Sequence, residues 1–392
     1  MKRIIFTLMF AALLLQVANA QRNANTLVTQ ITTAAELEQI STDAATQRGA
    51  YILMNDIEVS QWKPISNFKG AFNGNGHTVT IKSVADTLNA ITEDFSVRGT
   101  GIVYKNMPIC NIGIFTTLQG TVKNLRVRGE ISIEKLNTIR QGTFYGNQVT
   151  VTLFDDNIST IRAGGIAGTN NGRIQNCISD LKINIRAVKK TVDVRIYYRS
   201  DKVEEKQSAI IGGIAGVNNG VISDSYAIGS IVSAGDGMKY LGGIAGDNVG
   251  NIFRSYCTGS VAAQGEGICC AGGITGANKG ALVNCVAMNQ SITAEGEPRN
   301  DCGVGALAGM GSNYDRHKSY ALKEIAITET YKMNPPKPKF MVSRSATEDE
   351  AFWQRQIKGY DISFAFGAEE AKPWMWDSAA KRPRLYWEPI AN

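Results

Sequence analysis

This sequence has few histidines, no cysteine pair with zinc-binding spacing, and only one long apolar run. Only two of the 392 residues are histidine, His77 and His317, and the seven cysteines include no Cys-x-x-Cys pair. No spacing typical of a zinc site is therefore present, and we expect neither a metal ion nor another cofactor. His77 follows a glycine turn and has no sequence neighbour that would orient it, so we assign it no catalytic role.

The one markedly apolar run lies at the start of the chain. Lys2 and Arg3 precede an apolar core from Ile4 to Leu15, and Ala18-Asn19-Ala20 follows. This pattern predicts a signal peptide cleaved after Ala20, and hence a protein that is secreted, periplasmic or on the cell surface. No later stretch is apolar enough to predict a transmembrane segment. No cysteine follows the cleavage site, so we do not expect a lipoprotein anchor.

Charge of one sign is also limited. The formal net charge is +6, and removal of Lys2 and Arg3 with the signal peptide leaves +4 on the predicted mature chain. Such a mild balance on an exported chain does not favour nucleic acid as a partner.

A glycine-rich repeat dominates the middle of the chain. Four copies are clear: GGIAGTNNGRIQNC from Gly164, GGIAGVNNGVISDSY from Gly212, GGIAGDNVGNIFRSY from Gly242 and GGITGANKGALVNC from Gly272. Weaker copies begin at Gly113 and Gly305. We take the second glycine of each clear copy, and Gly113 and Gly305 themselves, as equivalent markers. The basic spacing is about 30 residues, with two enlarged units, which indicates a repeat architecture.

Equivalent positions of the repeats form columns of one chemical type. Two residues after the turn glycine the residues are apolar, and five and seven residues after it they are mostly small; these columns share one parity and should point inward. Their members are Val122, Ile174, Ile222, Ile252 and Leu282; Leu125, Cys177, Ser225, Ser255 and Cys285; and Val127, Ser179, Ala227, Cys257 and Ala287. A further column holds Asn170, Asn218, Asn248 and Asn278, whose amides should bond to one another along the stack. We therefore predict an all-β parallel β-helix, a solenoid of coils.

The repeat GGIAGxNxGxIxxSYxxGxI resembles the GLUG motif, a short glycine-rich repeat of bacterial secreted and cell-surface proteins. The resemblance covers roughly Asn111 to Asn313. It implies a β-helix-like architecture and a role at the cell surface, and it brings no catalytic residues with it.

The remaining segments should close the two ends of the solenoid. Thr33 and Glu36 form a capping box that predicts a helix of about three turns, ending near Arg48 and covering the first coil. We divide the chain into residues 1–20 (signal peptide), 21–110 (cap helix and opening coils), 111–313 (repeats) and 314–392 (connector and aromatic-rich C-terminal cap). Three of the five tryptophans fall within residues 374–387, and we expect this segment to plug the last coil.

Two insertions enlarge the repeats, within residues 133–162 and 184–210. Both should be hairpins emerging from one face of the solenoid. The second is basic and carries a Tyr-Tyr pair, so it is either an anionic-glycan contact or an ordinary solvated hairpin. The candidate contact residues there are Arg186, Lys189, Lys190, Arg195, Tyr197, Tyr198 and Arg199. Tyr226 and Tyr256 share an outward parity in consecutive coils, either as a sugar-binding stack or as a structural one.

The seven cysteines are an odd number, so at least one is unpaired within a monomer. Cys270 and Cys302 each lie three residues before a marker glycine. Strand stacking would place them about 4.8 Å apart, and we predict a disulfide between them.

These features favour an exported, non-enzymatic, adhesin-like binding protein. Its partner would be an acidic polysaccharide, a mucin or a host matrix protein. The alternative is a carbohydrate-active enzyme, a lyase or a hydrolase, because β-helices host both. A hydrolase needs two facing carboxylates, and adjacent Asp155 and Asp156 point to opposite faces of a strand. A third possibility, an accessory module of a larger exported assembly, is not separable from the first by sequence.

Overall fold

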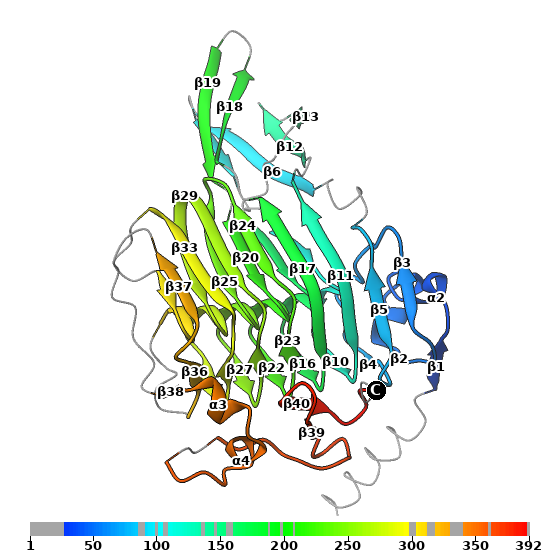
Figure 1. Cartoon of the computed structure of the whole chain (residues 1–392). Coiled ribbons are helices and arrows are strands. Elements are labelled where there is room, and N and C mark those ends of the chain that lie inside the picture. The colour runs from blue at the N-terminus through cyan, green and yellow to red at the C-terminus, as the bar shows by residue number, and fades with distance from the viewer. Residues whose placement is uncertain are drawn as a thin grey trace, which may run out of the picture.

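The computed structural model describes most of the chain beyond the predicted signal peptide. The described residues are 27–84, 91–98, 101–104, 109–134, 138–144, 147–153, 160–186, 189–196, 199–206, 208–297, 303–311, 318–329, 340–359 and 362–389. The protein is mostly β, and parallel sheets dominate it (Figure 1).

The repeat coils together build four rows of parallel strands. The first row contains β8 (Ile109–Ile112), β14 (Thr160–Gly164), β20 (Ser208–Gly212), β25 (Met238–Gly242), β29 (Val261–Gly272) and β34 (Val304–Gly305). The second contains β9 (Phe115–Leu118), β15 (Ala167–Asn170), β21 (Ala215–Asn218), β26 (Ala245–Asn248), β30 (Thr275–Asn278) and β35 (Ala308–Met310).

The third row also includes the opening coils. It contains β1 (Val28–Ile31), β2 (Ala50–Leu53), β4 (Ala71–Asn73), β10 (Thr121–Lys123), β16 (Arg173–Gln175), β22 (Val221–Ser223), β27 (Asn251–Phe253) and β31 (Ala281–Val283). The fourth contains β3 (Ile57–Val59), β5 (Thr78–Ile81), β11 (Arg126–Ile133), β17 (Ile178–Arg186), β23 (Tyr226–Ala227), β24 (Ile231–Ala234), β28 (Tyr256–Cys257), β29, β32 (Val286–Ala287), β33 (Ser291–Glu297), β36 (Tyr320–Leu322), β37 (Ala326–Glu329) and β38 (Met341–Val342). The long strand β29 runs through both the first and the fourth row, and this arrangement is consistent with the predicted parallel β-helix.

The predicted inward columns form the core between these rows. Val122 pairs in register with Ile174, and the pairing continues through Ile222 and Ile252 to Leu282. All of these side chains are fully buried, and so are the small residues of the next two columns. The core is thus a stack of like residues, as the repeat predicted.

The asparagine column forms a hydrogen-bonded ladder inside the protein. Asn170 Nδ2 donates to Asn218 Oδ1 at 2.7 Å, Asn218 Nδ2 to Asn248 Oδ1 at 2.7 Å, and Asn248 Nδ2 to Asn278 Oδ1 at 2.8 Å. Because each amide both donates and accepts, the ladder satisfies polar groups that would otherwise be costly to bury.

A matched pair of substitutions should measure this ladder. Asn218→Ala leaves a buried donor on Asn170 and a buried acceptor on Asn248 without partners, and we expect it to lower the free energy of unfolding by about 2–3 kcal/mol. The next residue, Asn219, makes a similar bond to Asn171 at 2.8 Å on the exposed surface. Asn219→Ala should cost about 0.5 kcal/mol or less. Urea unfolding of both variants measures the difference, and equal losses would contradict a special role for the buried ladder.

The N-terminal helix is shorter than predicted. The capping box is present, with Glu36 N–H donating to Thr33 Oγ1 at 3.3 Å, but α2 spans only Ala34–Gln39 and a 3-10 turn, η1 (Thr46–Arg48), follows. The Asp43 carboxylate accepts from the Ala45 and Thr46 N–H groups, and this local turn replaces the predicted second and third helical turns. The helix still buries Leu37 at the end of the core.

Both predicted insertions are hairpins, and a third was missed. The first insertion contains β12 (Thr138–Phe144) and β13 (Asn147–Leu153), and the second contains β18 (Lys189–Ile196) and β19 (Arg199–Lys206). The missed hairpin, β6 (Ile91–Arg98) and β7 (Gly101–Tyr104), lies between β5 and β8, the equivalent place in an earlier coil. Strand β6 pairs in parallel with β12, and all three hairpins leave the coils at the same end of the strands (Figure 1).

The sequence predicted that the C-terminal segment plugs the last coil. In the structure the segment instead runs back along the outside of the coils. It contains α3 (Arg344–Thr347), α4 (Glu350–Trp353), β39 (Trp374–Asp377) and β40 (Arg382–Leu385). Its contacts begin at Tyr320, beside Phe352, and continue to Lys123, whose Nζ donates to Glu370 at 2.8 Å. Outward aromatic rings of the middle coils provide the apolar surface on which the segment packs.

The last weak copy, at Gly305, is shifted by one residue from the predicted alignment, whereas the copy at Gly113 keeps the predicted step of 52 residues in three of the four rows. Gly305 pairs with Gly272 and not with the marker Gly273, so Ala306 occupies the place of the second glycine. The predicted register of the disulfide changes with it. Cys270 is disulfide-bonded, while its predicted partner Cys302 lies outside the described residues. Five other cysteines, Cys110, Cys177, Cys257, Cys269 and Cys285, are free and buried.

Candidate functional site

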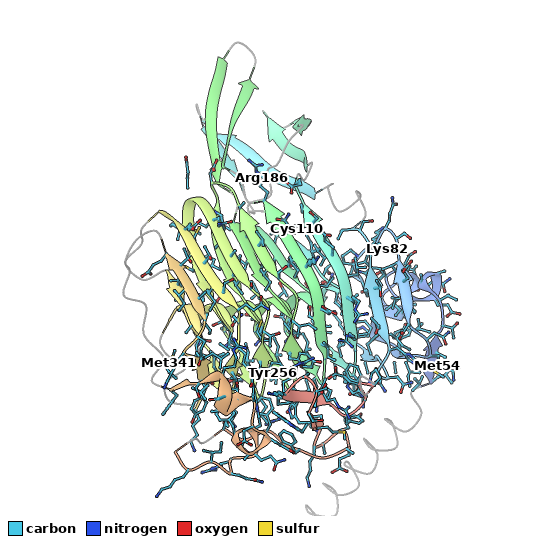
Figure 2. The ribbon with its side chains drawn as sticks, in the orientation of Figure 1. Met54, Lys82, Cys110, Arg186, Tyr256 and Met341 are labelled. Atoms are coloured by element: carbon cyan, nitrogen blue, oxygen red, sulfur yellow. The ribbon has the colours of Figure 1, made fainter. Side chains whose placement is uncertain are left out.

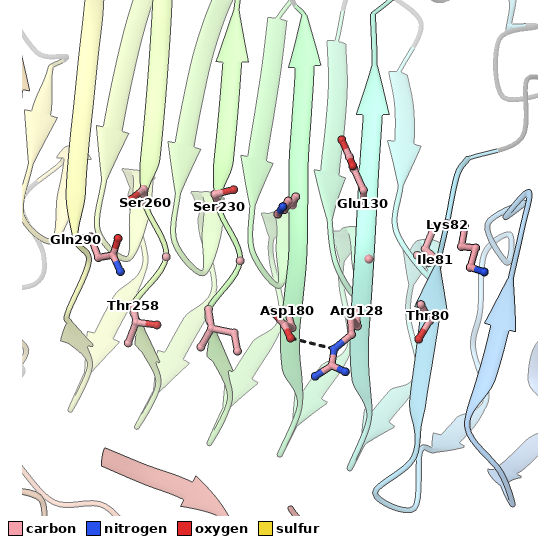
Figure 3. A pocket seen from close by; sticks show the side chains of 15 residues that line it. Thr80, Ile81, Lys82, Arg128, Glu130, Asp180, Ser230, Thr258, Ser260 and Gln290 are labelled. Carbon is pink, nitrogen blue, oxygen red and sulfur yellow. Dashed lines mark hydrogen bonds and ion pairs between the residues drawn. The ribbon is translucent and has the colours of Figure 1, made fainter. Parts of the chain in front are cut away.

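An open groove of about 690 Å³ crosses the outer face of the fourth row. It runs perpendicular to the strands, from Lys82 after β5 to Gln290 before β33, and so passes over six successive coils (Figure 3). A linear polymer lying in this groove could contact each coil in turn, because neighbouring strands present their side chains at a regular spacing.

Three glycines lie in the floor of the groove, at positions where a side chain would collide with the neighbouring strand. Gly129 has a φ of 114°, and a Cβ built there would lie 1.8 Å from the Ile81 carbonyl oxygen. A Cβ at Gly229 would lie 1.8 Å from the Leu181 oxygen, and one at Gly259 would lie 1.9 Å from the Gly229 oxygen. In the later coils the strand is interrupted at these glycines, between β23 and β24 and between β28 and β29, which makes the face concave.

Charged side chains of both signs line the first half of the groove, and two of them form an ion pair. Arg128 Nε lies 3.1 Å from Asp180 Oδ2, and these two residues are in register on β11 and β17. Glu130 is in register with Lys182, one step further along the same strands. Each groove carboxylate therefore has a cation at the facing register position. The third cation, Lys82, pairs with Glu58 beside the groove, so this part of the surface is close to neutral.

Hydroxyl and amide groups line the second half. Ser230, Thr258, Ser260 and Gln290 are at least partly exposed there, and Ser291 Oγ donates to Ser260 Oγ at 3.0 Å. These groups can each donate and accept hydrogen bonds without a net charge. The sequence analysis missed this row, although the Gly-Ser dipeptides at Gly229 and Gly259 mark it in successive repeats.

The two predicted binding groups, the basic residues around the β18–β19 hairpin and the tyrosines Tyr226 and Tyr256, lie far apart. Arg186 is exposed at the end of β17, at the base of the β18–β19 hairpin. The strands that carry Lys189, Lys190, Arg195 and Arg199 are described but their side chains are not, and Tyr197 and Tyr198 lie outside the described residues. Tyr226 pairs with Ile178 at the start of β17, eight residues from Arg186, so the two groups are about 26 Å apart. Figure 2 shows Arg186 at the hairpin end of the coils and Tyr256 toward the opposite end.

Tyr226 and Tyr256 are not an exposed binding surface. Their rings are stacked, with centroids 4.6 Å apart and planes 7° from parallel, and both residues are 0% exposed. The C-terminal segment covers them. Tyr226 Oη donates to Glu388 Oε2 and Tyr256 Oη to the Pro383 carbonyl, each at 2.6 Å. Burial raises the pKa of both phenols, so they remain neutral donors and form the structural stack that was the alternative interpretation.

An ion pair that sequence analysis missed anchors the C-terminal segment beside this stack. Asp224 is buried, and its carboxylate accepts from Arg254 Nε and Nη2, each at 2.6 Å, and from Trp374 Nε1 at 3.0 Å. Both Asp224 and Arg254 occupy left-handed turn positions, with φ of 50° and 41°. The equivalent residues of other coils are Asn124, Asn176 and Asn284. An alignment of the repeat sequences reveals this column of turn residues, in which Asp224 and Arg254 replace the asparagines of the other coils.

His77 has a partner that the sequence did not suggest. Its Nδ1 lies 3.3 Å from Asp56 Oδ1, and the same carboxylate oxygen accepts the Thr78 N–H at 2.8 Å. Asp56 is largely exposed, and both contacts fix the start of β5. Among the described residues, no group of three or more histidine, cysteine or acidic side chains is placed to hold a metal ion.

No protein-family model and no curated protein matches the chain, so the likeness to the GLUG motif stays a prediction. A crystal structure of a Bacteroides ovatus protein, provisionally described as an immunoglobulin A1 protease, has a similar fold. The match has a TM-score of 0.54 and 16% sequence identity, and it covers 93% of this chain and 94% of the other. At this identity the likeness concerns the fold alone. None of the helices in the described part of this chain has the length and apolar character needed to cross a membrane.

Proposed function

We propose that the protein is an exported, non-enzymatic binding protein of the bacterial surface, whose solenoid of coils presents the groove to an extended glycan. The observation that carries this proposal is the composition of the groove. Its glycine floor lets a chain approach the backbone, and its serine, threonine and glutamine side chains offer hydrogen bonds in successive coils. A polyhydroxylated polymer is the ligand class that such a surface fits.

The paired charges favour a neutral glycan over an acidic one in the groove itself. Arg128 pairs with Asp180, and Lys82 pairs with Glu58. Lys182 is in register with Glu130, so little uncompensated positive charge remains. An acidic polysaccharide or mucin, the partners expected from the sequence, would instead contact the basic β18–β19 hairpin. The same pairing argues against hydrolysis in the groove, because a glycosidase needs two carboxylates that act on the substrate.

A binding assay can separate the two faces. The mature chain, Gln21–Asn392, is incubated with neutral polysaccharides, acidic polysaccharides and mucin, and bound chain is measured. The double variant Ser260→Ala/Gln290→Ala removes two groove hydrogen-bonding groups, and we expect about tenfold weaker binding of neutral glycan. Replacing Lys189–Lys206 by a short turn is the matched control, because it removes the hairpin and leaves the groove intact.

Two outcomes would contradict the proposal. Neutral-glycan binding that depends on the hairpin and not on the groove would move the site. New chain ends or an unsaturated product in the same tubes would favour the carbohydrate-active enzyme instead. Because of the structural likeness reported above, immunoglobulin A1 is included in the panel, and its fragmentation would point to proteolysis.

A further inference from the structure

A lysine occupies a position in the core of the coils. Lys239 lies in an inward column of the first row, in register with Ala209 on one side and Cys269 on the other, and Ala209 is in register with Ile161. These neighbours are apolar or small, and Lys239 is 0% exposed. An ammonium group is costly to place in such surroundings without hydrogen-bonding partners, so its contacts there are informative.

The Lys239 amine is held against the Cys269 thiol. Its Nζ donates to the Gly237 carbonyl at 2.6 Å and is within hydrogen-bonding reach of the Cys269 side chain. The sulfur is also close to the Gly267 and Glu295 carbonyl oxygens, at 3.3 and 3.2 Å. Adjacent parallel strands, β25 and β29, thus present an amine and a thiol side by side.

Cys269 differs from the other four free cysteines. Burial raises the pKa of the Cys110, Cys177, Cys257 and Cys285 thiols to about 12, so these thiols are inert at neutral pH. Burial also raises the pKa of Cys269, but the Lys239 ammonium opposes the shift. Cys269 is 6% exposed, whereas Cys177, Cys257 and Cys285 are 0% exposed. A small oxidant should therefore react first at Cys269.

We propose that Lys239 and Cys269 form an oxidation-dependent covalent cross-link, a sulfenamide, between β25 and β29. A peroxide supplies the oxidising equivalents. It oxidises the thiol to a sulfenic acid and is reduced to water. The amine, after losing its proton to solvent, attacks the sulfur and forms the S–N bond, and the sulfenic hydroxyl leaves as a second water. A thiol, an amine and one peroxide thus give the cross-link and two waters.

The link would add to the disulfide at the adjacent residue, Cys270. Together they would tie the later coils covalently in an oxidising, extracellular setting. A thiol reductant would restore both free residues.

Peptide mapping of the full mature chain tests the proposal. After hydrogen peroxide treatment and alkylation under denaturing conditions, trypsin should no longer cut after Lys239. A linked peptide that contains both Lys239 and Cys269 should appear, about 2 Da lighter than the same peptides without the S–N bond, and dithiothreitol should separate the Lys239 segment from it. Lys239→Met keeps the volume of the side chain and removes the amine, and in this variant Cys269 should accumulate as a dimedone-reactive sulfenic acid. Cys257, buried without a lysine, serves as the internal control and should stay alkylatable.

Three results would overturn the proposal. The first is sulfenic or sulfinic acid at Cys269 in the wild-type chain, with tryptic cleavage after Lys239 intact. The second is exchange of Cys269 into the Cys270 disulfide. The third is an equal dimedone reaction in the wild-type and Lys239→Met chains. The wild-type peptide map decides the question even if the variant does not fold.

Discussion

Raising the pH from about 8 to about 10 should lower the free energy of unfolding by about 5 kcal/mol through four buried thiols alone. Cys110, Cys177, Cys257 and Cys285 have their pKa raised by burial from 9.0 to about 12. In the unfolded chain the same thiols ionise near their ordinary value. Between these two values the unfolded state loses protons that the folded state keeps, so alkali favours unfolding.

The direction and the window follow from the raised folded-state pKa. The contribution is fully present below about pH 9 and declines as the pH rises from there toward about 12. Each thiol adds about 1.4 kcal/mol for each pH unit in this window. Urea unfolding at the two pH values, followed by tryptophan fluorescence, measures the loss.

Serine substitution provides the control for the alkaline effect. Cys177 and Cys285 share a column with Ser225 and Ser255, so Cys177→Ser/Cys285→Ser places residues that the fold already accepts there. The double variant should lose about half of the thiol-dependent pH effect. If its stability falls with pH as steeply as that of the wild type, other groups cause the loss and the thiol explanation is wrong.

Removal of the Asp224 carboxylate should be the most damaging of the side-chain substitutions considered for this protein. Asp224→Ala deletes the acceptor of two Arg254 hydrogen bonds and of the Trp374 indole N–H. The guanidinium and the indole would remain partly or fully buried without their partner. Breaking a buried ion pair in this way costs about 3–5 kcal/mol, and we expect the lower end because Arg254 keeps some solvent access. The loss is measured by urea unfolding.

The exposed pair in the groove is the matched control for Asp224. Asp180 pairs with Arg128 at 3.1 Å, but both side chains are solvated. Asp180→Ala should therefore cost less than about 1 kcal/mol. Because Trp374 belongs to the C-terminal segment, Asp224→Ala should also make that segment easier to cleave by protease in the otherwise folded chain. A loss below about 1 kcal/mol, with unchanged proteolysis, would show that the segment is held by its aromatic contacts alone.

The repeat was the most informative feature of the sequence. Stacking Ile174 on Ile222 and Ile252, and Asn170 on Asn218, predicts parallel strands with inward apolar and amide columns, and the register confirms both. The last weak copy was harder to align, because Ala306 occupies the place of the marker glycine there. The helix from Ala34 was overestimated because a local Asp43 turn competes with helix continuation.

The groove was only partly visible in the sequence. The repeated Gly-Ser pairs at Gly229 and Gly259 reveal a column, but not that the column lies on a concave outer face. The pairing of the charged side chains in the groove could not be seen in the sequence either. Arg128 and Asp180 are 52 residues apart in the chain, and only the strand register places them together.

The sequence by itself determined the coil, its period and the residues inside it, because identical short strands stack with like side chains in register. The tertiary structure decided what remains on the surface. The outward tyrosines at 226 and 256 look like a binding stack until Glu388 and Pro383 are seen to cover them. The repeat period indicates which residues are neighbours between successive coils. It does not indicate that the C-terminal segment packs back on the coils, because that segment lies outside the repeats. Lys239 shows the same limit, since its burial against Cys269 follows from the register of two strands and not from its own chemistry.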